Sequence, residues 1–575
     1  MPNTISPEEL PNSFSNFFSD KVNKIRAELD LSTDSPDFSA FSGQAFHGFV
    51  PVSETDVMKI LKASSKKTCS LDPVPAEILF QCLNELVPVI TKVINTSLKT
   101  GTVPSSFKEA NVTPLIKKAN LDVNVLNNFR PVSNLPFISK VLEKVVLQQL
   151  MDHFAKNDLL EPFQSAYRSH HSTETALLYV MNDLLLACDN GQSTLLSLLD
   201  LSAAFDTLDH GILLQRLHTT FGVCDTALEW FKSYLTDRTQ SVVLNGVSSK
   251  PALLKQGVPQ GSVLGPVLFS MCVTPLGNLT KRFDIFYHMY ADDTQLYRSA
   301  SSCQFPENVE KIQQAVESVK VWMTNNKLKL NCDKTELIKI ATRPKLKSLP
   351  QGSTVMFSGT NIPFSDTVRD LGVYLDGSLS MEAHINTLCK SMFLELRRIS
   401  HIRSLLDEAA TKSLMSAFIM SRMDYCNSLL YGIPSNLMNR VQRAQNNAAR
   451  IVLRKRKFDH AKPMLRELHW LPFRARIDYK ISTLCFKCLH GLAPEYLSNL
   501  ITPYIPRRTL RSAHTDQLTV PRVKLDTFGK RSFVFAAPTV WNSLPQCLRE
   551  RTSLPAFKSG LKAHLFRKYL LGCES

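Results

Sequence analysis

The sequence has few of the features that mark secreted, repetitive or membrane-embedded proteins. Its 13 cysteines are an odd number without the regular spacing of a disulfide framework. Nothing at Met1 resembles a signal peptide, so the sequence favours a reducing intracellular compartment. It shows neither an internal repeat nor a low-complexity tract, and its composition excludes the fibrous, collagen-like and globally disordered classes.

One stretch of 25 residues, between Lys255 and Lys281, contains no Asp, Glu, Lys or Arg. It is long enough to span a bilayer, but prolines, glycines and the amides Gln256 and Gln260 interrupt it. We therefore expect a loop followed by a buried helix, and no membrane partner.

A spacing typical of some zinc sites, C-x-x-C-x-H, occurs at Cys485, Cys488 and His490. No fourth ligand stands at a diagnostic distance along the chain. The alternative is a core helix, which is favoured by the apolar neighbours Leu484, Phe486 and Leu489.

The chain is long and its charge is unevenly distributed. Its 575 residues, 44% of them hydrophobic, suffice for several packed domains. From Arg440 to Ser575 there are 26 Lys and Arg against 8 Asp and Glu, whereas residues 1–439 hold 41 basic and 43 acidic residues. The net charge of +16 therefore arises in the last quarter of the chain. Such a basic face suits nucleic acid or an anionic membrane; the alternative is an ordinary solvated surface.

Apolar periodicity predicts helices and strands without the regular alternation of a parallel α/β fold, so we expect an α+β protein. Ser53 is expected to cap a helix. Further helices are predicted near residues 14–29, 76–98, 139–154, 308–327 and, with breaks, 381–456. Strands are predicted near residues 111–118, 193–202, 241–245, 283–290, 336–340 and 368–375, the last ending in a hairpin-type turn at Asp376-Gly377.

Two adjacent aspartates, Asp292 and Asp293, stand between two strand-like runs in FYHMYADDTQLYRSA. Strand interiors disfavour Asp, and a buried carboxylate is costly unless it is paired. Asp200 interrupts a second apolar strand in LLSLLDLS; if the two strands pair, it meets Asp292 at the same end of the sheet. Carboxylate oxygens suit Mg²⁺, and a pair of such ions supports phosphoryl transfer. The alternative for the aspartate pair alone is an ordinary turn.

Three motifs in a fixed order, LLDLSAAFDTLDH, QGVPQGSVLGPVLF and YADD, resemble the signature set of reverse transcriptases. More narrowly, the chain resembles the enzyme of non-LTR (LINE-type) retrotransposons of the jockey-like and chicken-repeat-like branch, from about Leu71 onward. The resemblance implies a right-hand polymerase with fingers, a palm built on an antiparallel sheet, a helical thumb and a basic, mainly helical C-terminal region. Its expected parts are a polar leader (1–50), an N-terminal extension with the fingers (51–190), the palm (191–378), the thumb (379–460) and the C-terminal region (461–575).

The resemblance implies RNA-directed DNA synthesis with two Mg²⁺ ions, or Mn²⁺ in their place. The metal-binding acids fall on Asp200 and Asp292, with Asp293 as the third acid. Lys334, with Lys329 as the alternative, matches a lysine that protonates the departing pyrophosphate.

Other positions match the parts that bind substrate. Phe205 matches the aromatic residue beneath the incoming sugar, with core packing as the alternative. Gln260 and Gly261 match the loop at the template and nascent base pair. Arg168 matches the arginine that grips the triphosphate, Lys117 is a weaker candidate for that charge, and Arg130 is the basic residue of the fingers motif. Asp209 is expected to cap a helix, and VRDLGVYLD resembles a primer-grip hairpin centred on 371–373.

A thumb helix that follows a duplex is predicted from basic residues at near-heptad spacing, beside the apolar face of Val441, Ala444, Ala448 and Ile451. These basic residues are Arg440, Arg443, Arg450, Arg454 and Lys457. A solvated charged face is the alternative.

The partners implied are an RNA template, a DNA primer or nicked target DNA, and deoxynucleoside triphosphates. The implied place of action is the nucleus, with a cytoplasmic ribonucleoprotein as a second location. Residues 1–50 are too short for the endonuclease that members of this branch usually carry, so we expect a truncated copy or part of a longer frame, with an endonuclease supplied elsewhere. Two other functions stay open: a catalytically idle nucleic-acid-binding remnant, and a group II intron-like maturase.

Overall fold

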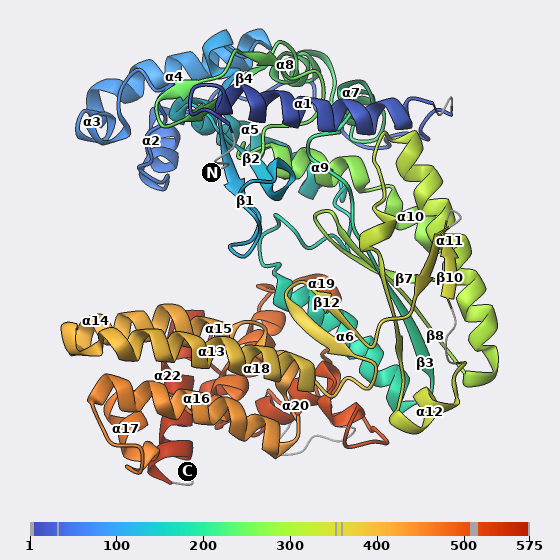
Figure 1. The fold of residues 1–575 in the computed structure, drawn as a ribbon, viewed down its shortest axis with the longest axis vertical. Coiled ribbons are helices and arrows are strands. Elements are labelled where there is room, and N and C mark those ends of the chain that lie inside the picture. The colour runs from blue at the N-terminus through green and yellow to red at the C-terminus, as the bar shows by residue number, and fades with distance from the viewer. Residues whose placement is uncertain (1–4, 32–33, 351–353, 358–359, 506–515, 573–575) are drawn as a thin grey trace. The chain divides into compact units, whose positions relative to one another are not determined.

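The computed structural model describes residues 5–31, 34–350, 354–357, 360–505 and 516–572, and the chain divides into two compact units. The first unit comprises Met1–Gln164, Asp200–Leu279 and Glu317–Asn331, and the second comprises Ser165–Leu199, Thr280–Val316 and Cys332–Ser575. Each unit combines helices with strands (Figure 1), which confirms the expected α+β class.

The first unit is built on a five-stranded sheet, in which β1 pairs antiparallel with β2 and parallel with β4. Its strands are β1 (Glu109–Ile116), β2 (Phe129–Asn134), β4 (Thr239–Leu244), β5 (Val247–Ser248) and β6 (Ala252–Leu253). Its helices are α1 (Leu10–Leu29), α2 (Glu54–Lys62), α3 (Ala76–Gln81), α4 (Leu83–Thr100), α5 (Phe137–Lys156), α7 (His210–Thr219), α8 (Asp225–Leu235) and α9 (Gly265–Val273), followed by α10 (Leu276–Lys281), which ends at the unit boundary.

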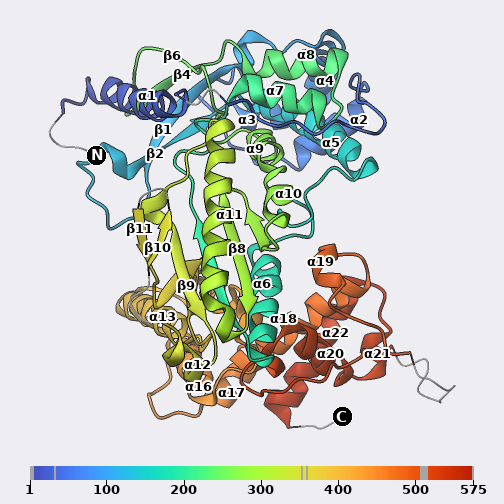
Figure 2. The same ribbon diagram turned by 90° about the vertical axis from the view of Figure 1, so that its right-hand side faces the viewer.

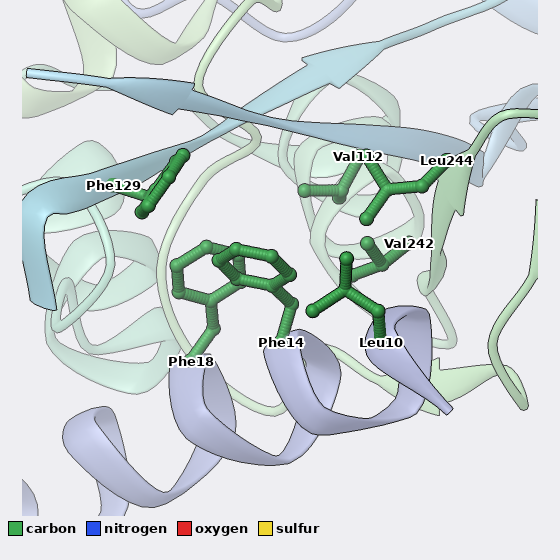
Figure 3. Close-up of a cluster of buried hydrophobic side chains, with 7 residues drawn as sticks. All are labelled: Leu10, Phe14, Phe18, Val112, Phe129, Val242 and Leu244. Carbon is green, nitrogen blue, oxygen red and sulfur yellow. The ribbon is translucent and has the colours of Figure 1, made fainter. Parts of the chain in front are cut away.

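Helix α1 covers this sheet because its apolar residues recur at intervals of three or four positions. Leu10, Phe14 and Phe18 point toward the strands (Figure 3) and pack on residues of β1, β2 and β4. The rings of Phe14 and Phe129 meet edge to face, with centroids 5.1 Å apart. The N-terminal segment is thereby part of the core of the first unit.

The second unit is built on a four-stranded antiparallel sheet in the order β7-β8-β3-β9, and Figure 1 shows β7, β8 and β3 side by side. Its strands are β3 (Ser193–Leu199), β7 (Phe286–Tyr290), β8 (Asp293–Ala300) and β9 (Glu336–Ile340). Two further hairpins are β10 (Thr354–Phe357) with β11 (Thr360–Pro363) and β12 (Thr367–Asp370) with β13 (Val373–Asp376).

Helices make up most of the rest of the second unit. They are α6 (Thr173–Asp189), α12 (Arg343–Ser348), α13 (Glu382–Ile402), α14 (Glu408–Met415), α15 (Ser421–Asp424), α16 (Ser435–Leu453), α17 (Ala461–Glu467), α18 (Phe473–Leu489), α19 (Glu495–Ser498), α20 (Phe533–Asn542), α21 (Gln546–Arg549) and α22 (Leu554–Phe566). Helix α11 (Phe305–Asn325) begins in this unit and ends in the first. Helices α18, α20 and α22 gather into one bundle (Figure 2).

Two predicted elements differ from the structure. The single helix expected over 76–98 is two helices, because Cys82 leaves the helical region with φ −109° and ψ 32°. The single strand expected over 368–375 is the β12–β13 hairpin, and Asp376-Gly377 is not its turn. Instead, Asp376 accepts main-chain N–H groups from Ser378, Ser380 and Met381, which leads the chain into α13.

The cysteines of the C-x-x-C-x-H motif lie in α18, with both side chains buried. Burial raises the pKa of each thiol, that of Cys488 to about 12. The ring of His490 stacks on Phe486 with centroids 3.9 Å apart. The predicted core helix is confirmed, although Leu489 is exposed.

The uncharged stretch before Lys281 forms a loop and two short helices, α9 and α10, as expected. Over the described part of the chain, no helix combines the length and the apolar character that crossing a bilayer demands.

Candidate active site

The adjacent aspartates lie at the tip of the β7–β8 hairpin. Tyr290 pairs with Asp293, so Ala291 and Asp292 alone form the turn. Ala291 has a φ of 56°; tight hairpin turns favour such a backbone, which costs a residue with a Cβ about 1–2 kcal/mol. Ala291 is buried, Asp292 is half-buried and Asp293 is exposed. A short, strained turn thus presents two neighbouring carboxylates.

The register of β3 against β8 relates these acids to Asp200. Leu199 is the last residue of β3 and pairs with Thr294. Asp200 follows Leu199 in the chain, and Asp293 precedes Thr294. Asp200 is grouped with the first unit, where its carbonyl accepts the N–H of Asn331 at 2.9 Å and its Oδ2 accepts from Asn331 Nδ2 at 3.3 Å. An aspartate therefore follows the end of β3, and another begins β8.

The three predicted metal ligands are divided between the units, with Asp200 in the first and the other two in the second. Among the described residues, no three or more His, Cys, Asp and Glu side chains form a group suited to a metal ion. The side chains of the three predicted ligands nevertheless fit a metal ion such as Mg²⁺, because carboxylate oxygens suit hard divalent cations.

A further acid that sequence reasoning missed, Asp370, lies near Asp293. Asp370 is 3% exposed, and its Oδ1 accepts a hydrogen bond of 2.7 Å from Gln295 Nε2 in β8. Burial is the main reason why the pKa of Asp370 rises to about 7, and the negative charges of Asp293 and Glu336 also raise it. Negative charge therefore accumulates at this end of the sheet, as a cation site requires. The signal for Asp370 was the same as for Asp200, an acid next to apolar strand residues.

The hairpin that carries Asp370 turns at Leu371 and Gly372, as predicted. Their φ angles of 42° and 88° both lie in the left-handed region, where glycine fits without strain. The hydroxyl of Tyr425 donates to the carbonyl of Leu371 at 2.6 Å. Tyr425 thereby fastens the tip of this hairpin to the helical part of the second unit.

The segment that carries Arg168 is attached to β7. The N–H of Ser165 donates to the carbonyl of Met289 at 2.9 Å, and Ser165 Oγ lies 2.8 Å from His288 Nε2. Arg168 is half-buried three residues later. Its charge acts on Tyr496, whose pKa is raised by burial and lowered by hydrogen bonds and by Arg168. Arg168 and the aspartate hairpin therefore share one scaffold.

Tyr496 brings the C-terminal region to this scaffold, a contact that sequence reasoning missed. Its hydroxyl donates to Thr175 Oγ1 at 3.1 Å, because the Thr175 hydroxyl itself donates to the Ser172 carbonyl. The Ser165 hydroxyl, 2.8 Å away, then donates to Tyr496. Burial lowers the pKa of His288 to about 3, so the imidazole is neutral and donates its Nε2 proton to Ser165. The four groups form one directed chain of hydrogen bonds.

In the first unit, the Gln260-Gly261 loop is held from two sides. Gln260 Nε2 donates to Asp206 Oδ1 at 2.7 Å, and the Gln260 carbonyl accepts the N–H of Ser133 at 2.8 Å. Gly261 has a φ of 137°, and a Cβ at this position would lie 2.3 Å from the Ser133 carbonyl oxygen. Glycine is therefore required by a close main-chain approach, as the motif predicts.

Phe205 is half-buried and stacks on Phe269 of α9, with ring centroids 4.8 Å apart. Its carbonyl accepts the N–H of Val258 at 2.9 Å. The predicted helix cap at Asp209 is confirmed: its Oδ1 accepts the N–H of Ile212 at 2.9 Å.

A buried glutamate that the sequence analysis did not single out, Glu143 of α5, supports the same loop. Glu143 Oε2 accepts the N–H groups of Val263 and Leu264, at 2.6 Å and 3.0 Å. Burial raises the pKa of Glu143 despite these bonds. The N–H groups at the start of a helix have no carbonyl acceptor within that helix. Glu143 supplies an acceptor for the two N–H groups just before α9.

Arg130, the basic residue of the fingers motif, and Lys117, the weaker candidate for the triphosphate, lie in or next to the paired strands β1 and β2. Arg130 is exposed in β2, opposite Leu115. Lys117 follows β1, and its Nζ donates to the Asn127 carbonyl at 2.5 Å. The charge of Lys117 lowers the pKa of Asp206, although burial raises that pKa more strongly. Lys117 is thus near the acid that holds Gln260.

The two candidate lysines have different surroundings. Lys329, in the first unit, forms an ion pair with Glu28 of α1. Lys334, in the second unit, is exposed in the 3-10 turn η4 (Cys332–Lys334), which leads into β9.

The predicted basic helix corresponds to α16 only in part. Val441, Ala444 and Ala448 are buried as expected, and Arg443 is exposed. The helix ends at Leu453, and Arg454 caps it with a φ of 51°. Arg454 and Lys457 were therefore wrongly assigned to the helical face. The chain turns left-handed at Arg454, so both lie beyond the helix, while Arg440 and Arg450 are half-buried on it.

Comparison with known proteins gives a match to one family. Residues 116–374 match the family described as reverse transcriptase (RNA-dependent DNA polymerase). The chain is 27% identical over 323 residues to the RNA-directed DNA polymerase from mobile element jockey of Drosophila melanogaster, covering 55% of this chain and 34% of that protein. It is 26% identical over 420 residues to the probable RNA-directed DNA polymerase from transposon BS of the same organism, covering 70% and 44%. The chain spans less than half the length of these relatives.

Proposed function

From the match of residues 116–374 to the reverse transcriptase family, we propose that the chain is an RNA-directed DNA polymerase of a non-LTR retrotransposon. The register that pairs Leu199 with Thr294 carries the proposal. Asp200 follows the last residue of β3, and Asp293 is the first residue of β8, beside the turn residue Asp292. Acids at the ends of paired strands are what a polymerase needs to hold cations against a triphosphate.

Asp200, Asp292 and Asp293 would hold Mg²⁺, or Mn²⁺ in its place. When bound, two such ions activate the attacking oxygen and stabilise the leaving one. Burial is the main cause of the raised pKa of Asp370, and the negative charge of Asp293 adds to it. A bound cation would offset that negative charge.

The other residues act on substrate directly. Arg168 offers its guanidinium fork to the phosphates of the incoming nucleotide. Phe205 lies beneath the sugar, where its ring would clash with a 2′-hydroxyl. Its ring packs against Phe269, which keeps it from moving away from that hydroxyl. Gln260 and Gly261 approach the template and the nascent base pair, and Lys334 donates a proton to pyrophosphate.

We assign the parts of the chain to a right-hand polymerase. The fingers, with Arg130 and Lys117, belong to 51–190, the palm to 191–378 and the thumb to 379–460, and residues 461–575 hold nucleic acid through their positive charge. The partners are an RNA template, a DNA primer or nicked target DNA and deoxynucleoside triphosphates. The place of action is the nucleus.

Primer extension on an RNA template tests the proposal. Asp292→Asn keeps the size of the side chain and removes its charge, so extension should fall by at least about a hundredfold. Asp284→Asn is the matched control, because this acid is 81% exposed and only loosely paired with Arg298, at 3.5 Å. Undiminished synthesis by Asp292→Asn would exclude the assignment, and RNA binding without synthesis by the parent protein would point to an idle remnant.

A further inference from the structure

A basic turn between α16 and α17, residues 454–459, exposes a single aromatic ring. Its first four residues are Arg-Lys-Arg-Lys, and all four are exposed. Phe458 follows and is 89% exposed, the largest value among the bulky hydrophobic side chains that the structure describes. Lys457 Nζ lies 5.9 Å from the centroid of this ring. A phenyl ring so fully in water has no role in the fold of the second unit.

The basic turn is held in one shape by its own hydrogen bonds. The N–H of Asp459 donates to the Arg456 carbonyl at 3.2 Å, which makes Lys457 and Phe458 the central residues of a β-turn. Asp459 Oδ2 accepts the N–H of Arg456 at 2.7 Å. Arg450 of α16 donates from Nη2 to the Asp459 carbonyl at 3.0 Å. The only acid of the turn is thus used to close it, and these bonds hold the main chain that carries Phe458.

We propose that the basic turn is a binding site for single-stranded nucleic acid, with Phe458 stacked on an unpaired base and the flanking cations on phosphates. Proteins that hold single strands combine a cationic track with aromatic rings. A duplex offers the ring no free base face along its length, and an acidic peptide would use the cations without the ring. The inference rests on the proposed function, because a polymerase must hold template that is not yet paired.

Fluorescence anisotropy with labelled oligo(dT) and oligo(rU) of about 12 nucleotides, within the usual site sizes, tests the inference without catalysis. Phe458→Ala should weaken binding of one or both strands about 5- to 100-fold, the loss expected for one stacked base. Phe458→Trp should retain affinity. The double variant of Lys455→Ala and Lys457→Ala should bind with a weaker salt dependence. The slope of log affinity against log salt concentration should become shallower by about 0.7 for each lost phosphate contact.

Leu31→Ala is the control, since Leu31 is 83% exposed and lies in the first unit; it should bind like the parent. Parent-like affinity of Phe458→Ala for both strands would overturn the inference, and so would an equal loss for a hairpin duplex or for polyglutamate. Primer extension by the parent protein is measured in parallel. If no primer is extended, the proposed function fails, while a selective loss of single-strand binding in Phe458→Ala still supports the site.

Discussion

Removing one hydroxyl in the C-terminal region should weaken nucleotide binding by the second unit. Tyr496 is 7% exposed, and its hydroxyl joins Ser165 and Thr175 at 2.8 Å and 3.1 Å. Tyr496→Phe keeps the ring against His288, with which it packs edge to face at 5.0 Å. The variant leaves the Ser165 hydroxyl without its acceptor.

The size of the effect follows from the two lost hydrogen bonds. Each contributes about 0.5–1.5 kcal/mol net, so the second unit should lose about 1–3 kcal/mol of stability. Ser165 also fixes the segment of Arg168 to β7 through its main-chain bond to Met289. Of the two bonds, only the one to Ser165 bears on this segment, and it contributes at most about 1.5 kcal/mol. Because 1.4 kcal/mol corresponds to tenfold, we expect the KM for deoxynucleotides to rise up to about tenfold.

Tyr569→Phe is a matched control for this prediction. Its hydroxyl donates to Asp478 Oδ2 at 2.6 Å, inside the C-terminal region, and neither residue is a hydrogen-bond partner of Ser165. Urea unfolding should report a loss of stability in both variants. Primer extension at varied nucleotide concentration should show a raised KM in Tyr496→Phe alone. Equal KM values in the two variants would refute a positioning role for Tyr496.

Two further predictions concern a buried acid and a tight loop. In the folded protein the pKa of Asp370 is raised to about 7, whereas an unfolded chain has an Asp pKa of about 3.9. The contribution of protonated Asp370 to the free energy of unfolding is therefore fully present below about pH 4. It is lost as the pH rises to about 7, by at most about 4 kcal/mol. Asp370→Asn mimics the protonated acid. In EDTA its urea unfolding midpoint should therefore equal that of the parent at pH 4 and exceed it at pH 8. A difference between the two midpoints that does not change with pH would contradict this cause. Gly261→Ala should destabilise the first unit by more than about 3 kcal/mol, because its Cβ would lie 2.3 Å from a carbonyl oxygen. Gly246→Ala, at a φ of 83° and with nothing within 4 Å of the added Cβ, should cost only about 1–2 kcal/mol. Equal Tm values for the two variants would contradict the steric argument.

The elements of the sheet in the second unit could be read from local patterns. Strand β9 coincides with the predicted 336–340, and β3 and β7 lie within their predicted ranges. An acid in an apolar strand is a strong local signal, since burial penalises it; this is why Asp200 and the aspartate pair stood out. The same signal was present at Asp370, within the run predicted as a strand over 368–375, but this acid was not singled out.

Helix ends were predicted less well, because they depend on single residues. Cys82 breaks one predicted helix into α3 and α4, and the left-handed Arg454 ends α16 before the basic run. Periodicity averages over a window and does not detect one residue that leaves the helical region.

The sequence by itself determined the α+β class, the acids, the close-approach glycine and the basic charge of the C-terminal quarter, because each depends on the chemistry of a residue and its near neighbours. The tertiary structure alone decided which strand ends are neighbours, and it alone linked Asp370 to Gln295 and Tyr496 to Ser165, 331 residues away. Strand register and such distant hydrogen bonds arise from packing of whole elements, for which a local pattern carries no information.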